Sequence, residues 1–259
     1  MFDSHIHTKF STDSKMDIKQ VLDVSEKNDI GIVITEHLDL NFMRPGEFIF
    51  NIDKYFKEYS KYRNSKLLLG IEMGMRPDCI EENRKISKEY PFDFVLGSVH
   101  VVKMNNIYYD IYNKELYYNG SKTDIFIYYF NYIFRCIKEH NYIDSLAHID
   151  YIARYAKFHD KEIYYEEYRE YIDPTLKLLA DSGKAIEINT RRFTQKKVLE
   201  NMIKIFKRFK ELGGKFVTIG SDAHINKNIG NYYKEAKEIA DQCNLNIVYF
   251  KNRKVQYLK

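Results

Sequence analysis

The sequence predicts an α/β fold in which parallel strands close, or nearly close, into a TIM-like barrel within a single domain, residues 1–259. Two observations carry this prediction. Short apolar runs alternate with longer segments of helical periodicity, an order that produces parallel strands joined by crossover helices. In addition, 259 residues with 44% hydrophobic content can fill one substantial core. No internal repeat, low-complexity tract or linker divides the chain.

Seven apolar runs have the length and composition of buried strands, and the first and fifth have the weakest strand propensity. Seven β/α units are one fewer than the eight of the common barrel. The ending NIVYFKNRKVQYLK (246–259) predicts an appended hairpin. The seven runs are MFDSHIH (1–7), IGIVITEH (30–37), LLLGIEMG (67–74), FDFVLGSVH (92–100), YIDSLAHID (142–150), KAIEINT (184–190) and KFVTIGSDAH (215–224).

Capping patterns mark the helices between these runs. Ser14 and Asp17 have the spacing of a capping box, which predicts that a helix opens at MDIKQVLDVSEKND (16–29). Thr123 is expected to cap the helix DIFIYYFNYIFRCIKEH (124–140). Gly183 follows the helix before the sixth strand and suits the left-handed position that ends many helices.

The composition argues against several classes of protein. The 41 Lys and Arg residues against 37 Asp and Glu give a net charge of +4 that is spread along the chain, so no nucleic-acid partner is expected. No signal peptide and no apolar run long enough for a membrane span is visible. Cys79, Cys136 and Cys243 lack a C-x-x-C spacing, so we expect no disulfide framework and a cytoplasmic location. The oligomeric state is not determined by the sequence.

Histidines and acids gather where the predicted strands end. In a barrel all carboxyl ends emerge on one face, so residues far apart in sequence converge there. Taken singly, each histidine is better explained as a surface or hydrogen-bonded residue, but six at equivalent strand ends argue against coincidence. The other two, His140 and His159, lie in helix or loop patterns and receive that ordinary explanation. The residues at strand ends are His5, His7, His37, His100, His148 and His224, with Asp13, Glu36, Glu72, Asp150, Glu187 and Asp222.

This donor set predicts a cluster of metal ions. His5 and His7 are two residues apart on a strand, so their side chains point the same way and can engage one cation. A mixed His, Asp and Glu set without cysteine suits Zn, Mn or Fe. Because the donors exceed what one catalytic metal needs, two or three divalent ions are expected.

The ordered set of these motifs resembles the polymerase and histidinol phosphatase (PHP) family. The resemblance implies a distorted (β/α)7 barrel with up to three metals. It implies one ion held by His5, His7, Glu72 and Asp222, a second held by Glu72, His100 and His148, and a third held by Asp13, His37 and His224. The matching elements, in family order, are HIH (5–7), EH (36–37), GIE (70–72), GSVH (97–100), AHID (147–150) and GSDAH (220–224).

Within the family, the forms LGIEMG, LGSVH and AHIDYIARY look most like stand-alone histidinol-phosphate phosphatases. This implies hydrolysis of L-histidinol phosphate to L-histidinol and phosphate, a step of histidine biosynthesis. After EINT (187–190) the chain passes straight to RRF, where those phosphatases often carry a longer loop. A phosphodiesterase or nuclease of the same family, an amidohydrolase and a non-catalytic metal-stabilised module are the alternatives.

The expected mechanism is in-line attack on phosphorus by a hydroxide that bridges two cations. Asp222 with His224, or a metal-bound water, are the candidates for protonating the leaving group. Arg154 follows the fifth strand, and Arg191 and Arg192 follow the sixth. We expect Arg154 and one of this pair to bind the substrate phosphate, because a guanidinium donates two hydrogen bonds to adjacent oxygens. For a lone arginine a surface ion pair is the ordinary alternative.

Overall fold

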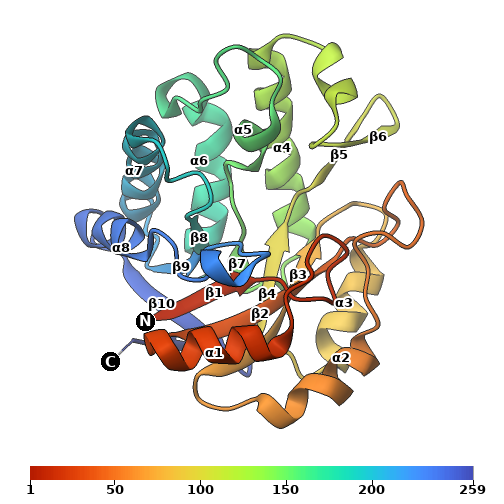
Figure 1. The fold of residues 1–259 in the computed structure, drawn as a ribbon. Coiled ribbons are helices and arrows are strands. Elements are labelled where there is room, and N and C mark those ends of the chain that lie inside the picture. The colour runs from red at the N-terminus through yellow and green to blue at the C-terminus, as the bar shows by residue number, and fades with distance from the viewer. Residues whose placement is uncertain (259) are drawn as a thin grey trace.

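Seven parallel strands at the centre of the molecule carry helices on their outside (Figure 1). The computed structural model describes residues 1–258. All seven predicted strands are present, although the fifth is reduced to two residues, and the predicted α/β fold is confirmed. In sheet order the seven strands are β1 (Phe2–Ile6), β2 (Gly31–Leu38), β3 (Leu67–Gly74), β4 (Phe94–Ser98), β7 (Ser145–Leu146), β8 (Ala185–Asn189) and β9 (Phe216–Gly220).

The barrel closes between its first and last strands through a single short contact. The amide of His7 donates to the carbonyl of Ala223 at 2.8 Å, and the amide of Asp222 donates to the carbonyl of His5 at 2.8 Å. Next to this contact, the amide of Ser221 donates to the buried carboxylate of Asp3 at 2.9 Å instead of to a backbone carbonyl of β1. Closure therefore ties His5 and His7 directly to the segment after β9.

The helices lie between successive strands, as the alternation predicts. Among residues 1–258, no helix combines the length and apolar character needed to cross a membrane. Three short 3₁₀ turns, at Ser60–Tyr62, Lys114–Tyr118 and Asn226–Asn228, occur in the connections. The α-helices are α1 (Ile18–Asn28), α2 (Ile52–Tyr59), α3 (Ile80–Glu89), α4 (Lys122–Glu139), α5 (Tyr151–Tyr155), α6 (Tyr165–Asp181), α7 (Lys196–Glu211) and α8 (Tyr233–Gln242).

The cap of α1 differs from the one expected. Asp17 is itself the N-cap and forms the capping box with Gln20, so the predicted pairing of Ser14 with Asp17 is wrong. The Ser14 hydroxyl instead donates to the carbonyls of His7 and His224, at 3.1 and 3.0 Å. A buried hydroxyl needs a hydrogen-bond partner. Ser14 therefore connects the two loops that carry these histidines and does not cap the helix.

The cap of α4 also differs. Ser121 caps the helix in a capping box with Asp124, so the expected cap at Thr123 is wrong by two residues. Ser121 suits this role because its side chain accepts from the Asp124 amide while Asp124 reaches back to the Ser121 amide. The left-handed backbone predicted at Gly183 is confirmed, with φ of +65°.

An antiparallel hairpin after β4 is absent from the sequence prediction. Strands β5 (Val101–Met104) and β6 (Ile107–Asp110) project from the barrel immediately beyond His100 (Figure 1). Asn105 and Asn106 make its tight turn, both with positive φ, a conformation that asparagine tolerates. The hairpin returns the chain to the carboxyl end of the barrel.

The predicted C-terminal hairpin is confirmed as β10 (Asn246–Lys251) and β11 (Lys254–Tyr257), while its last predicted residue, Lys259, lies outside the described part of the chain. Strand β10 also pairs in parallel with the start of β9. The Phe250 ring stacks on Phe94, the first residue of β4, with 5.2 Å between ring centroids. The hairpin thus covers the amino-terminal end of the barrel, opposite the histidine-rich face.

Replacing Phe250 by Ala is expected to lower the free energy of unfolding by about 3 kcal/mol, because the ring is 5% exposed and packs at the barrel end. Urea denaturation followed by circular dichroism measures this change. Tyr257→Ala is the control, since Tyr257 is 60% exposed and its loss should change stability by less than about 0.5 kcal/mol. Equal losses in the two variants would contradict the packing role of Phe250.

Candidate active site

The nine residues expected to hold metals all lie at the carboxyl end of the barrel. The ends of six strands, or the loops that follow them, deliver these nine residues, so the convergence depends on the parallel topology. Eight of the nine are buried or nearly so, and Asp13 is the more exposed member, at 41%. They are His5 on β1, His7 and Asp13 after it, His37 on β2, Glu72 on β3, His100 after β4, His148 after β7, and Asp222 and His224 after β9.

Glu72 is the centre of this cluster. Its side chain is completely buried, and both of its carboxylate oxygens face imidazole nitrogens. Nitrogens of five histidines lie within 3.5 Å of it, so this one carboxylate contacts groups delivered by four other strands. Oε1 lies 2.8 Å from His148 Nε2 and 3.1 Å from His100 Nε2, and Oε2 lies 2.7 Å from His37 Nδ1, 3.4 Å from His5 Nε2 and 3.5 Å from His7 Nε2.

The first histidine pair behaves as the two-residue spacing predicts. Nε2 of His5 and Nε2 of His7 are 3.0 Å apart, so both rings point toward one location. Asp222 Oδ1 lies 3.8 Å from the first nitrogen and 3.5 Å from the second. With Glu72 beside them, these atoms form a compact group of nitrogen and oxygen donors.

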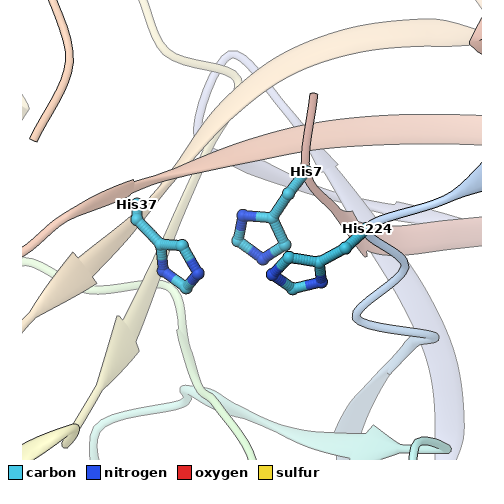
Figure 2. Close-up of side chains that lie close together, drawn as sticks. All are labelled: His7, His37 and His224. Atoms are coloured by element: carbon cyan, nitrogen blue, oxygen red, sulfur yellow. The ribbon is translucent and has the colours of Figure 1, made fainter. Parts of the chain in front are cut away.

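A second group lies toward solvent and contains one residue more than expected. Figure 2 shows His7, His37 and His224 close together, and the His7 ring stacks on both of the others, with centroid distances of 4.0 and 4.3 Å. Asp13 Oδ2 lies 3.0 Å from His224 Nε2, and its other oxygen lies 3.6 Å from His37 Nε2. The structure therefore places His7 between the inner and outer groups.

Further acids hold the histidines from behind. Glu187 Oε1 lies 2.7 Å from His5 Nδ1, and Asp39 lies 3.0 Å from His100 Nδ1. Such contacts fix the ring orientation and leave the opposite nitrogen free to face the centre of the cluster. Glu187 was predicted at a strand end without a role, and Asp39 was not among the predicted site residues. Gly74 at the end of β3 is related to Asp39. A Cβ at this position would overlap the Asp39 carboxylate, so the glycine leaves room for it.

The electrostatics of the cluster keep the buried Glu72 carboxylate ionised. Burial raises the pKa of Glu72, but the neighbouring His5 and His100 outweigh this effect and hold the pKa well below its usual value. Burial also disfavours the charged form of His37 and so lowers its pKa, but the Glu72 and Asp13 carboxylates outweigh this effect and raise the pKa to about 10. Burial lowers the pKa of His148, which favours its neutral imidazole, the form that binds metals.

These residues fit divalent cations. Among residues 1–258, several buried polar atoms of the cluster have no hydrogen-bond partner, including Glu72 Oε2, His37 Nδ1 and His224 Nε2. The first two lie only 2.7 Å apart, yet they lack the alignment of a hydrogen bond. Buried polar atoms are rarely left unsatisfied, and a cation between them would satisfy both. This set consists of imidazole nitrogens and carboxylate oxygens and contains no thiolate. Such donors suit zinc, manganese or iron.

Two of the three predicted arginines reach this cluster. Arg154 donates to Asp222 Oδ2 at 2.6 Å and to Asn189 Oδ1 at 3.1 Å. Arg191 donates to Asp222 Oδ1 at 3.2 Å and lies 2.8 Å from His224 Nδ1. Both line a cleft of about 280 Å³ in front of the cluster, at the small end of the range for small-molecule sites.

Arg192 is oriented away from the cluster. It donates to Asp150 at 2.9 Å and to Glu162 at 2.5 Å, and it does not line the cleft. Its two carboxylate partners hold its guanidinium in place. Of the adjacent pair, Arg191 is therefore the residue positioned to meet a ligand.

A comparison with protein families decides the family of this chain. The model of the PHP domain matches residues 3–191. This chain belongs to the PHP domain family. The matched region contains seven of the nine clustered residues and both arginines of the cleft, whereas Asp222 and His224 follow it.

Relatives of this PHP protein match it over almost the whole chain. A protein of Clostridium acetobutylicum named as a probable histidinol-phosphatase is 52% identical over 257 residues, covering 99% of each chain. A histidinol-phosphatase of Lactococcus lactis is 34% identical, covering 87% of this chain and 84% of the relative. The crystal structure of histidinol phosphate phosphatase from Lactococcus lactis, complexed with zinc, L-histidinol and phosphate, has a TM-score of 0.90 and 31% identity over 98% of both chains.

Replacing Glu187 by Gln is expected to weaken zinc binding by about tenfold or more. One Glu187 oxygen faces the His5 ring, and the other accepts from the His148 amide at 2.8 Å. An amide NH₂ at either place would lose an acceptor that orients a histidine. Competition with a chromophoric chelator measures the zinc affinity. Glu162→Gln removes a carboxylate that contacts Arg192 rather than the cluster, and it should bind zinc as the parent protein does.

Proposed function

We propose that this PHP protein is a metal-dependent phosphomonoesterase that hydrolyses L-histidinol phosphate to L-histidinol and phosphate. The observation that carries the proposal is the juxtaposition of a buried histidine–carboxylate cluster around Glu72 with the guanidinium groups of Arg154 and Arg191. The first group suits divalent cations and the second suits a phosphate. The 52% identical relative and the Lactococcus lactis complex with L-histidinol and phosphate support the choice of substrate.

Two or three divalent ions are proposed to bind in this cluster, with zinc as the first candidate because the similar crystal structure contains it. Manganese and iron suit the same donors. Such ions would supply Lewis-acid activation of water and would neutralise negative charge on the phosphoryl group. The proposed sets of residues are His5, His7, Glu72 and Asp222 for one ion, Glu72, His100 and His148 for a second, and Asp13, His37 and His224 for a third.

The phosphate is proposed to bind against Arg154 and Arg191. Arg154 is nearly buried and lines the cleft, where its contacts with Asp222 and Asn189 hold the guanidinium in place. Arg191 is 38% exposed at the cleft wall and uses one terminal nitrogen for its contacts with Asp222 and His224. Two fixed guanidinium groups would orient the phosphoryl group and stabilise the charge on its outer oxygens during the reaction.

The proposed hydrolysis joins the oxygen of a water molecule to phosphorus, breaks the bond from phosphorus to the alcohol oxygen and delivers one proton to that oxygen. We assign the delivery of this proton to His224, with Asp222 as its ionised partner 3.6 Å away. His224 lies at the solvent side of the cluster with 14% of its side chain exposed, where it can exchange a proton with a ligand in the cleft. Burial raises the pKa of Asp222, but Arg154 and His5 outweigh it and hold the pKa well below its usual range, so this carboxylate stays ionised.

The proposed function is tested by assaying zinc- and manganese-loaded protein against L-histidinol phosphate, other phosphomonoesters, a cyclic phosphodiester and an oligonucleotide. The expected result is hydrolysis of the monoesters, with L-histidinol phosphate giving the highest kcat/KM. Preferred cleavage of the diester or the oligonucleotide would reject the assignment. The metal content of the same samples should be at least two equivalents per chain.

Replacing Arg154 or Arg191 by Met is expected to lower kcat/KM toward L-histidinol phosphate by about thirtyfold each, the equivalent of about 2 kcal/mol of transition-state binding. Inhibition by inorganic phosphate should weaken in parallel. Arg192→Met is the matched control, because Arg192 faces Asp150 and Glu162 outside the cleft, and its phosphate inhibition should be unchanged. If Arg192→Met loses as much phosphate affinity as Arg154→Met at equal metal content, the phosphate assignment is wrong.

A further inference from the structure

The cleft contains one carboxylate that the cluster does not use. Asp13 and Asp39 each face histidines, and Asp222 is held by two arginines. Asp110 also lines the cleft, but it contacts no histidine of the cluster. Its side chain is 6% exposed, so this charge is largely removed from water, and its ion pair with Arg44 is long, at 4.0 Å.

The contacts of Asp110 leave it capacity for a ligand. One carboxylate oxygen accepts a 2.9 Å hydrogen bond from the Tyr112 amide. A nitrogen of the Arg44 guanidinium is 4.0 Å from the other oxygen. Arg44 is 54% exposed and is already bound to Glu47 at 2.7 Å. Burial raises the pKa of Asp110, which is the response of a carboxylate whose charge is incompletely compensated.

The hairpin missed by the sequence analysis gives Asp110 a fixed place beside the cluster. Asp110 ends β6 and pairs with Val101, the residue after His100. The next residue, Ile111, donates its amide to the His100 carbonyl at 2.9 Å. A ligand held by Asp110 therefore lies next to the metal-facing histidine in the same cleft.

An aromatic wall connects the cluster with the rim beside Asp110. Tyr151 lies 4.8 Å from His148 between ring centroids, Tyr155 lies 5.0 Å from Tyr151, and Tyr112 lies 5.1 Å from Tyr155. These rings line the cleft, with the Arg154 guanidinium 5.2 Å from the Tyr151 ring centroid, and aromatic rings of this kind bind planar groups and cations. The cleft thus combines an anion-binding end at Arg154 with an aromatic middle and a carboxylate at Asp110.

We propose that Asp110 is a specificity residue that binds the protonated amino group of the alcohol half of the substrate. This inference rests on the proposed phosphomonoesterase function and adds the residue that would select phosphate esters of amino alcohols over other phosphomonoesters. The ammonium group supplies donors that Asp110 accepts, and the phosphate at the other end of the ligand lies against the arginines. L-histidinol phosphate fits this division because it carries an amine, an imidazole ring and a phosphate.

The test compares Asp110→Asn with the parent protein on L-histidinol phosphate and on its analogue that lacks the amino group. Asparagine keeps an oxygen for the Tyr112 amide but removes the charge. KM for L-histidinol phosphate is expected to rise about thirtyfold, while KM for the deaminated analogue and inhibition by inorganic phosphate stay unchanged. Calorimetric binding of L-histidinol to the metal-loaded protein should weaken by the same factor.

Glu47→Gln is the matched control, because it removes one negative charge from the same rim without lining the cleft. It is expected to bind both substrates as the parent protein does. Equal losses on the two substrates in Asp110→Asn, or an unchanged preference for the amine, would overturn the inference. If the parent protein ignores L-histidinol phosphate but still selects other amino-alcohol phosphates through Asp110, the proposed substrate fails and the inference stands.

Discussion

The buried carboxylate of Glu72 is the constraint on which the rest of the site depends. A fully buried charge is costly unless its surroundings compensate it, and here imidazole nitrogens from β1, β2 and the ends of β4 and β7 surround it. The Glu72 charge can be surrounded in this way only if the contributing strands all end at the same height along the barrel axis. The barrel topology provides that alignment, and the carboxylate in turn gives the converging histidines a common partner.

The barrel also has to place the first strand beside the last. A single bridge between Ile6 and Ala223 joins them, with Asp3 bonded to Ser221 beneath it. This narrow closure brings His5 and His7 against Asp222, more than two hundred residues away in sequence. Because the parallel pairing is so short, hydrogen bonds from side chains such as Ser14 replace the missing ladder and position the loops of the site.

The two ends of the barrel have different tasks. At the amino-terminal end, Phe250 of the C-terminal hairpin stacks on Phe94 of β4, within an apolar cluster of buried residues. At the carboxyl end, polar groups are crowded together and several of them lack hydrogen-bond partners. The apolar end contributes stability, so the polar end can keep an arrangement that is unfavourable without a cation.

The sequence by itself determined the strand order, the seven β/α units and the convergence of nine potential ligands. Apolar periodicity is a local signal that marks the strands, and their alternation with helices implies parallel strands whose carboxyl ends share one face. It also placed Arg154 and the Arg191–Arg192 pair near that face. Only the tertiary structure decided that Arg192 is oriented away from the cluster toward Asp150 and Glu162, that Asp39 supports His100, and that Asp110 lies in the cleft. The reason is physical: these outcomes depend on side-chain direction in irregular loops and on a tight Asn-Asn hairpin, and neither leaves a periodic pattern in the sequence.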